Sequence, residues 1–282
     1  MSWTVVARKD FQDASRSRML WAIVGLFAVL MGVSALVPSL IGNDAPVAVG
    51  YDTAADLAET LVPVTALVAA YLSIAGERES GSIKLLLGAP HSRRDVTIGK
   101  LVGRSGVVVA GVLAGFLVAG LVAIVVYGEL DPGAFVSVAL LTAALGVTFV
   151  GIAIGISAAT ATRSRAMALA VGLFFVFALL WDLVPLALNY LRTGSVLAEG
   201  SVPAWQLLVQ RLNPSVAFRQ LVDAALALGE PSGLTATGPG MGDQQPDSTP
   251  FYLDDWFMLV VLGAWTVVPV LLGHLRFRDA DL

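Results

Sequence analysis

Six long apolar segments, separated by polar connections, dominate the pattern of hydrophobic and polar positions along the chain. An α-helix needs about 20 apolar residues to cross the hydrocarbon core of a membrane. The pattern therefore predicts an all-α polytopic membrane protein, built as a single domain over residues 1–282. Its six transmembrane helices are expected at about residues 19–41, 56–76, 105–127, 134–162, 166–191 and 256–275.

Residues 2–18, before the first span, have the period of a short amphipathic helix. One face carries Trp3, Ala7, Phe11 and Ala14, with Val6 beside them, and the other carries Arg8, Lys9, Gln12 and Asp13. We predict an interfacial (elbow) helix that lies at the membrane surface with Trp3 and Phe11 toward lipid. A disordered basic tail is the alternative.

The connection at 192–253 differs from the short ones. Residues 203–229 are semi-apolar and helical in period, with Asn213 at the N-cap position and Pro214 at the first helical position. Arg211, Arg219 and Asp223 prevent this stretch from crossing the membrane. We therefore predict amphipathic interfacial or re-entrant helices between the fifth and sixth spans. Within the fourth span, Gly151-x-x-x-Gly155 predicts a close approach to another helix.

Basic residues are distributed unevenly over the connections. All but three of the 17 Lys and Arg residues lie before the first span, after the second, after the fourth or after the sixth. Segments on the cytoplasmic side of a membrane carry an excess of Lys and Arg. This asymmetry predicts a multi-pass protein of the cytoplasmic membrane with cytoplasmic N- and C-termini, a cytoplasmic loop at 77–104 and an outer loop at 192–253.

Composition supports a chain that is solvated by the lipid bilayer. It is 57% hydrophobic and only 13% charged, against about 25% charged for a soluble domain, and its mean hydropathy is +0.81. The absence of cysteine excludes disulfides and thiolate metal ligands. The two histidines, His91 and His274, have no ligand spacing. We expect no metal site, no bound cofactor and no nucleic-acid partner.

The sequence contains no arrangement typical of an enzyme. Gly99-Lys100 continues into Leu101 and lacks both the upstream glycine and the hydroxyl of a phosphate-binding loop. No Ser/His/Asp set, His-Glu-x-x-His motif or pair of intramembrane carboxylates is evident. We expect no catalytic residue and no ATP bound through such a loop.

Asp182 is the one ionisable residue within the clearly apolar part of a span. Charges inside a membrane are costly and are candidates for functional sites, so Asp182 is a candidate intramembrane polar site. Its distance along the helix from Ala166 places it near the outer interface. A carboxylate that reaches outer water is the alternative interpretation.

The segment from Glu77 to Lys100 is the most organised polar stretch. An acidic pair, Glu77 and Glu79, precedes Gly81 and a short apolar patch, and Pro90 and a basic cluster follow. We predict a short helix that Ser80 or Ser82 caps and that Gly88 and Pro90 end. An apolar helix flanked by charges at a membrane surface predicts docking onto a soluble protein. The apolar contact would comprise Ile83, Leu86 and Leu87, and the orienting charges Glu77, Glu79 and Arg93.

This segment resembles the cytoplasmic loop after the second transmembrane helix of ABC-2 type exporter permeases. Weaker resemblances lie at residues 7–18 and 276–282, and together the three stretches look most like the branch that includes the permease of the nitrous-oxide-reductase maturation transporter. The matching loop residues are Glu77, Glu79, Gly81, Ser82, Leu86, Leu87, Pro90, Ser92, Arg93, Gly99 and Lys100.

The resemblance implies a transport subunit whose loop carries a coupling helix. That helix would meet a separate ATPase subunit, which binds ATP and Mg²⁺. The resemblance further implies an exporter of two permease chains and two ATPase subunits, and it leaves room for an accessory protein outside the membrane. The implied docking residues are Glu77, Glu79, Gly81, Ile83, Leu86, Leu87, Pro90, Ser92 and Arg93.

The competing hypothesis is a self-contained membrane protein, either a secondary transporter or the membrane anchor of a complex. Secondary transporters are typically built from internal repeats with broken helices at mid-membrane, and the sequence suggests neither. An anchor would not need so organised a loop. The transport hypothesis is therefore favoured, while the transported substrate is not specified by the sequence.

Overall fold

The computed structural model describes residues 3–41, 48–84, 92–128, 130–194, 202–226 and 250–280, and within these ranges it contains helices and no strand. The predicted all-α fold is therefore confirmed. Six of the described helices are long and apolar enough to cross a membrane, as predicted. They are Trp21–Leu40, Val49–Glu79, Arg93–Tyr127, Pro132–Ala159, Arg163–Leu180 and Asp255–Arg278.

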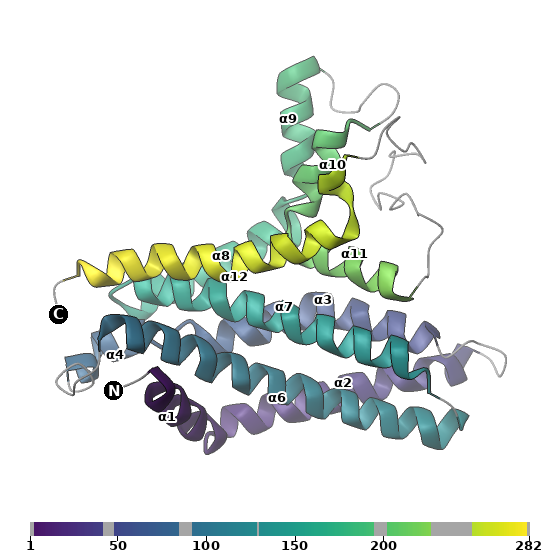
Figure 1. The fold of residues 1–282 in the computed structure, drawn as a ribbon, viewed down its shortest axis with the longest axis horizontal. Helices are drawn as coiled ribbons and strands as arrows, with labels where there is room; N and C mark the ends of the chain where they lie inside the picture. The colour runs from purple at the N-terminus through teal and green to yellow at the C-terminus, as the bar shows by residue number, and fades with distance from the viewer. Residues whose placement is uncertain are drawn as a thin grey trace.

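The long helices run roughly side by side in an elongated bundle (Figure 1). Helices α1 (Trp3–Ser15), α2 (Arg18–Ile41) and α6 (Arg93–Tyr127) lie on one side. Next to them are α3 (Ala48–Ala70) and α7 (Pro132–Ala159), followed by α8 (Arg163–Phe175) and α12 (Asp255–Arg278). Both ends of the chain lie at the same end of the bundle as the short helix α4 (Ala75–Glu79).

Glycines let the long helices approach closely. A Cβ atom at Gly155 of α7 would lie 2.3 Å from the carbonyl oxygen of Pro269 in α12, and one at Gly151 would lie 2.5 Å from that of Thr266. The predicted close approach along Gly151 and Gly155 is therefore confirmed, with α12 as the partner helix. Helices α6 and α1 are similarly close, because a Cβ atom at Gly99 of α6 would lie 2.5 Å from the Cβ of Val6 in α1.

Helix α1 corresponds to the predicted amphipathic helix, but only part of its apolar face is buried against the bundle. Ala7 and Ala14 are buried, whereas Trp3 and Phe11 remain 39% and 37% exposed. The polar side chains expected on the opposite face are exposed, namely Arg8, Lys9, Gln12 and Asp13. Asp10 is buried on the apolar side, which the sequence pattern did not predict.

The loop between the second and third spans is shorter than predicted. Residues 93–104, which we assigned to the loop, form the first turns of α6. We placed the end of the loop after Arg104 because charged residues are costly inside a membrane. In the structure Lys100 and Arg104 pair with acidic residues of neighbouring helices, and both can therefore belong to α6. Residues 82–84 are helical, whereas Leu86, Leu87 and Pro90 lie outside the described residues.

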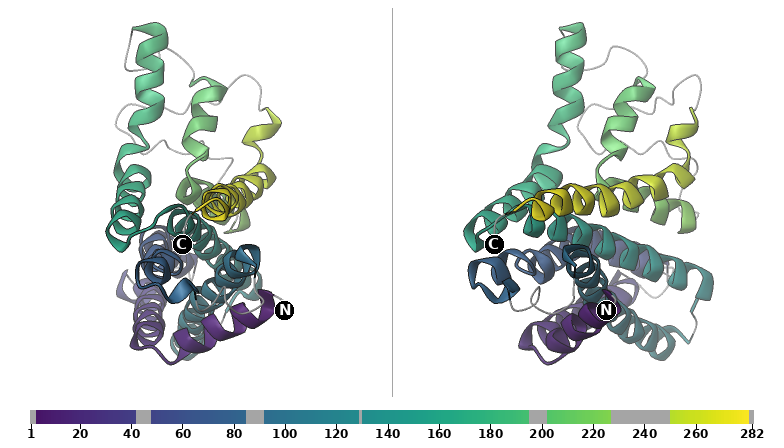
Figure 2. Two further views of the ribbon diagram at one scale, coloured as in Figure 1. Left: turned by 90° about the vertical axis from the view of Figure 1, so that its left-hand side faces the viewer. Right: turned by 60° about the vertical axis from the view of Figure 1, so that its left-hand side comes forward.

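The predicted fifth span, 166–191, is not one straight helix. Helix α8 continues into the π-helical segment η1 (Val176–Leu180), and α9 (Leu183–Thr193) then leaves at a steep angle (Figures 1 and 2). A π-helical turn leaves backbone groups without their usual partners. Here the side-chain amide of Asn213 donates to the carbonyl of Phe177 at 2.9 Å. Asp182 lies between this π-helical segment and the start of α9.

Amphipathic interfacial or re-entrant helices were predicted after this span, without a number, and the structure contains α10 (Ala204–Arg211) and α11 (Pro214–Leu226) there. Asn213 precedes α11 as predicted, and its Oδ1 accepts a hydrogen bond from the backbone N–H of Ser215 at 2.9 Å. Pro214 is the first residue of the helix. Helices α9 and α10 rise from the side of the bundle (Figure 2).

Candidate functional site: the charged end of the bundle

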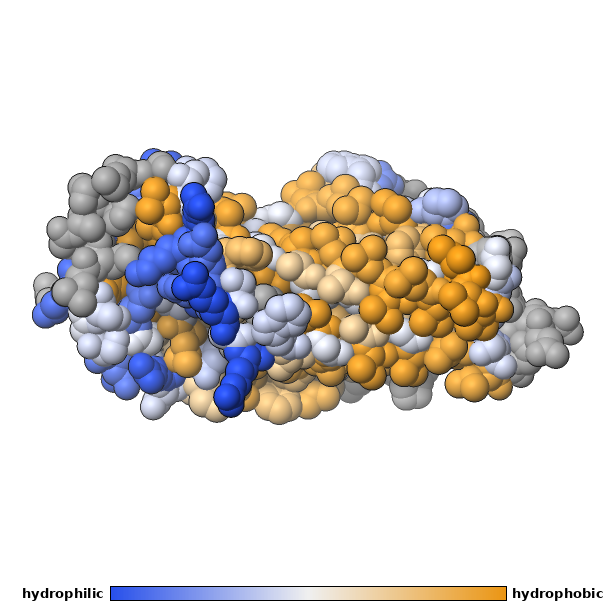
Figure 3. Space-filling model, turned by 90° about the horizontal axis from the view of Figure 1, so that it is seen from below, coloured by the Kyte–Doolittle hydropathy of each residue, from blue (hydrophilic) through white to orange (hydrophobic). Residues whose placement is uncertain are grey.

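The end of the bundle that holds both termini also gathers charged residues. Seen from below, hydrophilic residues cluster toward this end, whereas hydrophobic residues cover most of the remaining face (Figure 3). Helix α4 begins here, directly after α3. The hydroxyl of Ser157 in α7 accepts hydrogen bonds from the backbone N–H groups of Ile74 and Ala75, at 2.9 and 3.0 Å. This side chain from a distant helix satisfies donors at the start of α4.

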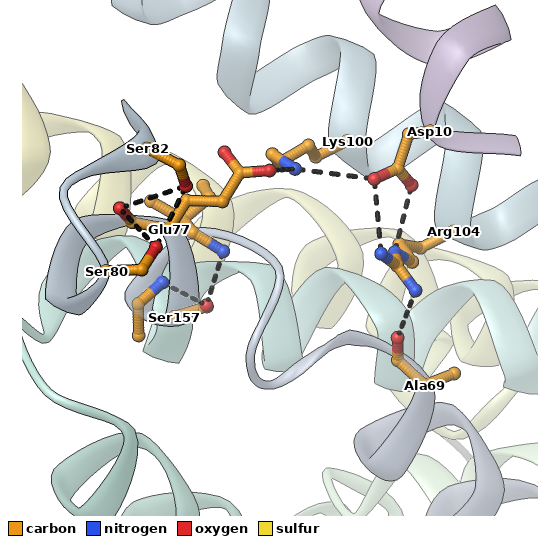
Figure 4. A network of polar contacts seen from close by, with 10 residues as sticks. Asp10, Ala69, Glu77, Ser80, Ser82, Lys100, Arg104 and Ser157 are labelled. Carbon is orange, nitrogen blue, oxygen red and sulfur yellow. Dashed lines mark hydrogen bonds and ion pairs between the residues drawn. The ribbon is translucent and has the colours of Figure 1, made fainter. Parts of the chain in front are cut away.

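A buried ion cluster joins α1, α4 and α6 (Figure 4). The Nζ of Lys100 lies 2.7 Å from Oε1 of Glu77 and 3.4 Å from Oδ1 of Asp10. The Nε of Arg104 lies 2.9 Å from Oδ2 of Asp10, and its Nη1 donates to the carbonyl of Ala69 at 3.1 Å. Two acids and two bases balance one another, which a low-dielectric interior requires.

The depth of this cluster makes its partners interdependent. The side chains of Lys100 and Asp10 are only 5% and 6% exposed, while that of Glu77 is 33% exposed. Glu77 therefore marks the place where the cluster reaches the surface. Removing one member would leave a buried charge without compensation.

Two arginines hold the carbonyl ends of neighbouring helices. The Nη1 of Arg93 donates to the carbonyls of Phe277, Arg278 and Ala280, at 2.5, 2.7 and 2.9 Å. The Nη1 of Arg78 donates to the carbonyl of Thr160, just after α7, at 2.8 Å. Cations suit helix C-termini because unpaired carbonyls carry partial negative charge there. Arg93, predicted as an orienting charge, thus has partners inside its own chain.

Glu79 and Gly81 fix the path of the chain after α4. The carboxylate of Glu79 accepts a hydrogen bond from the backbone N–H of Arg163, where α8 begins. Gly81 has a φ of 74°, a left-handed conformation that glycine adopts without steric cost. Gly81 follows Ser80, the C-cap residue of α4. The glycine of the sequence motif therefore allows the chain to turn at the end of this helix.

Ile83 and Ser92 differ from what the sequence suggested. Ile83 was expected in an exposed apolar patch, but it is 1% exposed and belongs to the hydrophobic core. Its side chain therefore anchors the beginning of the loop. Ser92 is the N-cap of α6, where its hydroxyl accepts from the backbone N–H of Asp95 at 3.1 Å. The Asp95 carboxylate accepts in return from the backbone N–H of Ser92 at 3.1 Å.

The structure therefore brings six of the predicted docking residues to one end of the bundle. Sequence reasoning missed three residues that help to build this end: Asp10, which pairs with Lys100 and Arg104, Arg78, which donates to the carbonyl of Thr160, and Ser157, which accepts from the start of α4. A signal for Asp10 was present, since it lies three or four residues from Val6, Ala7 and Ala14 on the apolar face of α1. The six residues are Glu77, Glu79, Gly81, Ile83, Ser92 and Arg93.

Asp182 belongs to a separate region, toward the opposite end of the bundle. It lines a cavity of about 140 Å³ together with Glu59 and Asn213. Nearby, Arg219 of α11 forms ion pairs with Asp52 and Asp56 of α3 and lies 3.0 Å from Asp223. Burial raises the pKa of Asp223, and the neighbouring Arg219 offsets part of that increase.

An all-helical bundle with six apolar, membrane-length helices and one charged end defines a multi-pass membrane protein. Residues 4–282 match the family described as ABC-2 family transporter protein, and the chain belongs to this family of ABC transporter permeases. Membership implies an ATPase partner. The matched family is a transporter family.

Two curated proteins are similar to the chain over most of its length. One, "Probable ABC transporter permease protein NosY" of Stutzerimonas stutzeri, is 33% identical over 280 residues, covering 97% of this chain and 96% of the relative. A protein of the same name from Pseudomonas aeruginosa is 35% identical over 238 residues, covering 80% of this chain and 84% of the relative. The predicted resemblance to ABC-2 permeases of this branch is confirmed.

Proposed function

We propose that the chain is the permease subunit of an ABC exporter and that it moves a substrate across the cytoplasmic membrane. A separate ATPase subunit, docked on residues 77–94, would bind ATP and Mg²⁺ and supply the energy. The observation that carries this proposal is the bridge of Lys100 between Glu77 of α4 and Asp10 of α1. It connects the docking segment to two further helices.

Through the contacts of Lys100 with Glu77 and Asp10, a movement of the docking segment would be transmitted to the membrane-spanning helices. Helix α4 is bound to α6 by Glu77 and Lys100, to α7 by Ser157, and to α8 by Glu79. Separating a buried charge from its partner costs about 3–5 kcal/mol. A displacement of α4 would therefore carry α6 and α1 with it, since moving α4 alone would strand these charges.

The docking surface itself is proposed from sequence and from the exposed side chains around it. Leu86 and Leu87 remain the expected apolar contact, whereas Ile83 is used inside the chain. Exposed Glu79, Lys84 and Arg94 stand at the rim. Rim charges contribute to orientation and association rate more than to affinity.

The assembly we propose contains two copies of this chain and two ATPase subunits. The described part of one chain contains six membrane-length helices, and the family resemblance implies two such chains for a complete path. The charged end with both termini would face the cytoplasm, as the distribution of Lys and Arg predicts. The segment 192–253 would then lie outside, where an accessory protein could reach it.

Purification of the complex tests this proposal against the self-contained alternative. The chain would be co-expressed with an ABC ATPase from a neighbouring gene, extracted in detergent and examined by native mass spectrometry. We expect two permease and two ATPase copies, together with ATP hydrolysis by the complex. A permease that purifies alone, under conditions in which the ATPase is folded and present, would favour a secondary transporter or an anchor.

A further inference from the structure

Two cavities lie one after the other between α3 and α8. Residues 59, 60, 63, 64, 67 and 68 of α3, followed by Tyr71 just after the helix, line them in turn, which is a single stripe at helical spacing. Phe174 of α8 lines both cavities. With about 1.5 Å of rise per residue, the stripe from Glu59 to Tyr71 is about 18 Å long. The two cavities are neighbours that share the wall formed by Phe174, and we name them together the α3–α8 groove.

The part of the groove toward the charged end of the bundle is apolar. It has a volume of about 270 Å³ and is lined by Val64, Leu67 and Val68 of α3 together with Met167 and Val171 of α8. Val68 and Met167 are 52% and 54% exposed. This part has the shape and lining that suit an alkyl chain.

The other part of the groove is polar and acidic. Its cavity of about 140 Å³ is lined by the carboxylate residues Glu59 and Asp182, by Thr60 and Ser215, and by the rings of Phe149, Phe174 and Phe177. Aromatic rings attract cations through their faces. Chemically, this end combines negative charge, hydroxyl groups and aromatic walls.

Among the residues that the structure describes, no hydrogen bond or ion pair joins the carboxylate group of Glu59 or Asp182 to another side chain, although the Ser215 hydroxyl donates to the backbone carbonyl of Glu59 at 3.4 Å. Arg219 is occupied by Asp52, Asp56 and Asp223. Glu59 is half-buried and Asp182 is exposed. A cationic ligand would give these carboxylates the ion-pair partner that no described side chain supplies.

We propose that the α3–α8 groove binds a single-chain amphiphile with a cationic head group. The alkyl chain would lie along Val64, Leu67 and Val68, and the head group would lie between Glu59 and Asp182. This inference rests on the proposed transport function and assigns its substrate class. An anionic head group would meet two like charges, which makes selection by charge the distinguishing property of the site.

Cysteine labelling tests this inference, because the chain has no cysteine of its own. Val68→Cys places a thiol in the apolar part and Ala178→Cys places one in the polar part. The permease–ATPase complex would be held in nanodiscs, and the labelling rate with N-ethylmaleimide would be measured with dodecylamine, with dodecanoate and without either. A Glu59→Gln/Asp182→Asn background preserves the shape of the cavity and removes its charge.

We expect dodecylamine to slow labelling at both positions about tenfold more than dodecanoate does, the size of one charge-assisted interaction. The neutral background should remove this difference. Equal protection by both amphiphiles would overturn the proposal, and so would protection by neither. Thiols that are unreactive without ligand, and that crosslink between two copies, would show that a second chain covers the groove and would also overturn it.

The same samples separate this inference from the proposed function. If the complex retains its ATPase and hydrolyses ATP while the amine gives no selective protection, only the assignment of the groove fails. If no ATPase associates with the permease, the transport function itself fails.

Discussion

The Nζ of Lys100 in α6 lies 2.7 Å from Oε1 of Glu77 in α4, although 23 positions separate the two residues in the chain. This ion pair closes the base of the segment that joins the second and third membrane-length helices. Because Lys100 also contacts Asp10 of α1, the base of the loop and the N-terminal helix share one buried cation. The loop and two helices are therefore expected to move together.

Replacing Lys100 by methionine tests whether this cluster stabilises the charged end. Lys100→Met leaves Glu77 without its cation and leaves Asp10 with Arg104 alone. We expect the free energy of unfolding to fall by about 3–5 kcal/mol, the cost of breaking a buried ion pair from one side. A lower midpoint of thermal unfolding in detergent would report this loss.

The matched control is Lys84→Met, since Lys84 is exposed and makes no ion pair within the described residues. It should leave the midpoint unchanged, because isolated surface charges contribute little. Equal midpoints for both variants would contradict the structural importance of the cluster.

Gly155→Ala tests the contact between α7 and α12. A Cβ atom at this position would lie 2.3 Å from the carbonyl oxygen of Pro269, so the two helices would have to separate. Overpacking of this kind typically costs about 1–3 kcal/mol. We expect a lower unfolding midpoint, measured with the permease alone.

Gly172→Ala provides the comparison, because nothing lies within 4 Å of a Cβ at Gly172. Alanine favours a helix over glycine by up to about 1 kcal/mol, so this variant should be as stable as the original chain or slightly more so. If Gly155→Ala is tolerated equally well, α7 and α12 are not packed as described.

Labelling of single cysteines tests the proposed topology. Ser2→Cys and Asp281→Cys should be protected from a membrane-impermeant maleimide in intact cells, and Thr237→Cys should be labelled. The reason is that basic residues are retained on the cytoplasmic side. Labelling at position 2 or 281, or protection at 237, would refute this orientation.

The six membrane-length helices were predictable because the length and apolar composition of a segment can be read directly from consecutive residues of the sequence. The close approach at Gly151 and Gly155 was predictable for the same reason. The break beside Asp182 was not, since the apolar pattern continues unbroken through Val176–Leu180 while the backbone there is π-helical. The straight helix ends at a tertiary contact, in which the side-chain amide of Asn213 donates a hydrogen bond to the carbonyl of Phe177.

The charged end was predictable in location but not in construction. Charged residues between two spans were assumed to face water, whereas Lys100 is buried and pairs with Asp10, 90 positions away. Ile83 was predicted in an apolar contact for a partner protein, whereas the structure buries it in the core of its own chain. Pairings of this kind depend on which helices meet, and one sequence without its fold does not specify that.

The most direct test of the coupling account is the Leu86→Asp variant, measured as the amount of ATPase that co-purifies with the permease. Burying one such apolar side chain contributes about 1.5–3 kcal/mol, so its replacement by a charge should weaken association at least about tenfold. Leu191→Asp, at an exposed leucine of α9, should retain the ATPase. Loss of the ATPase in Leu86→Asp alone, with an unchanged unfolding midpoint, is the predicted result. Full stoichiometry of the ATPase in Leu86→Asp would contradict docking on residues 77–94.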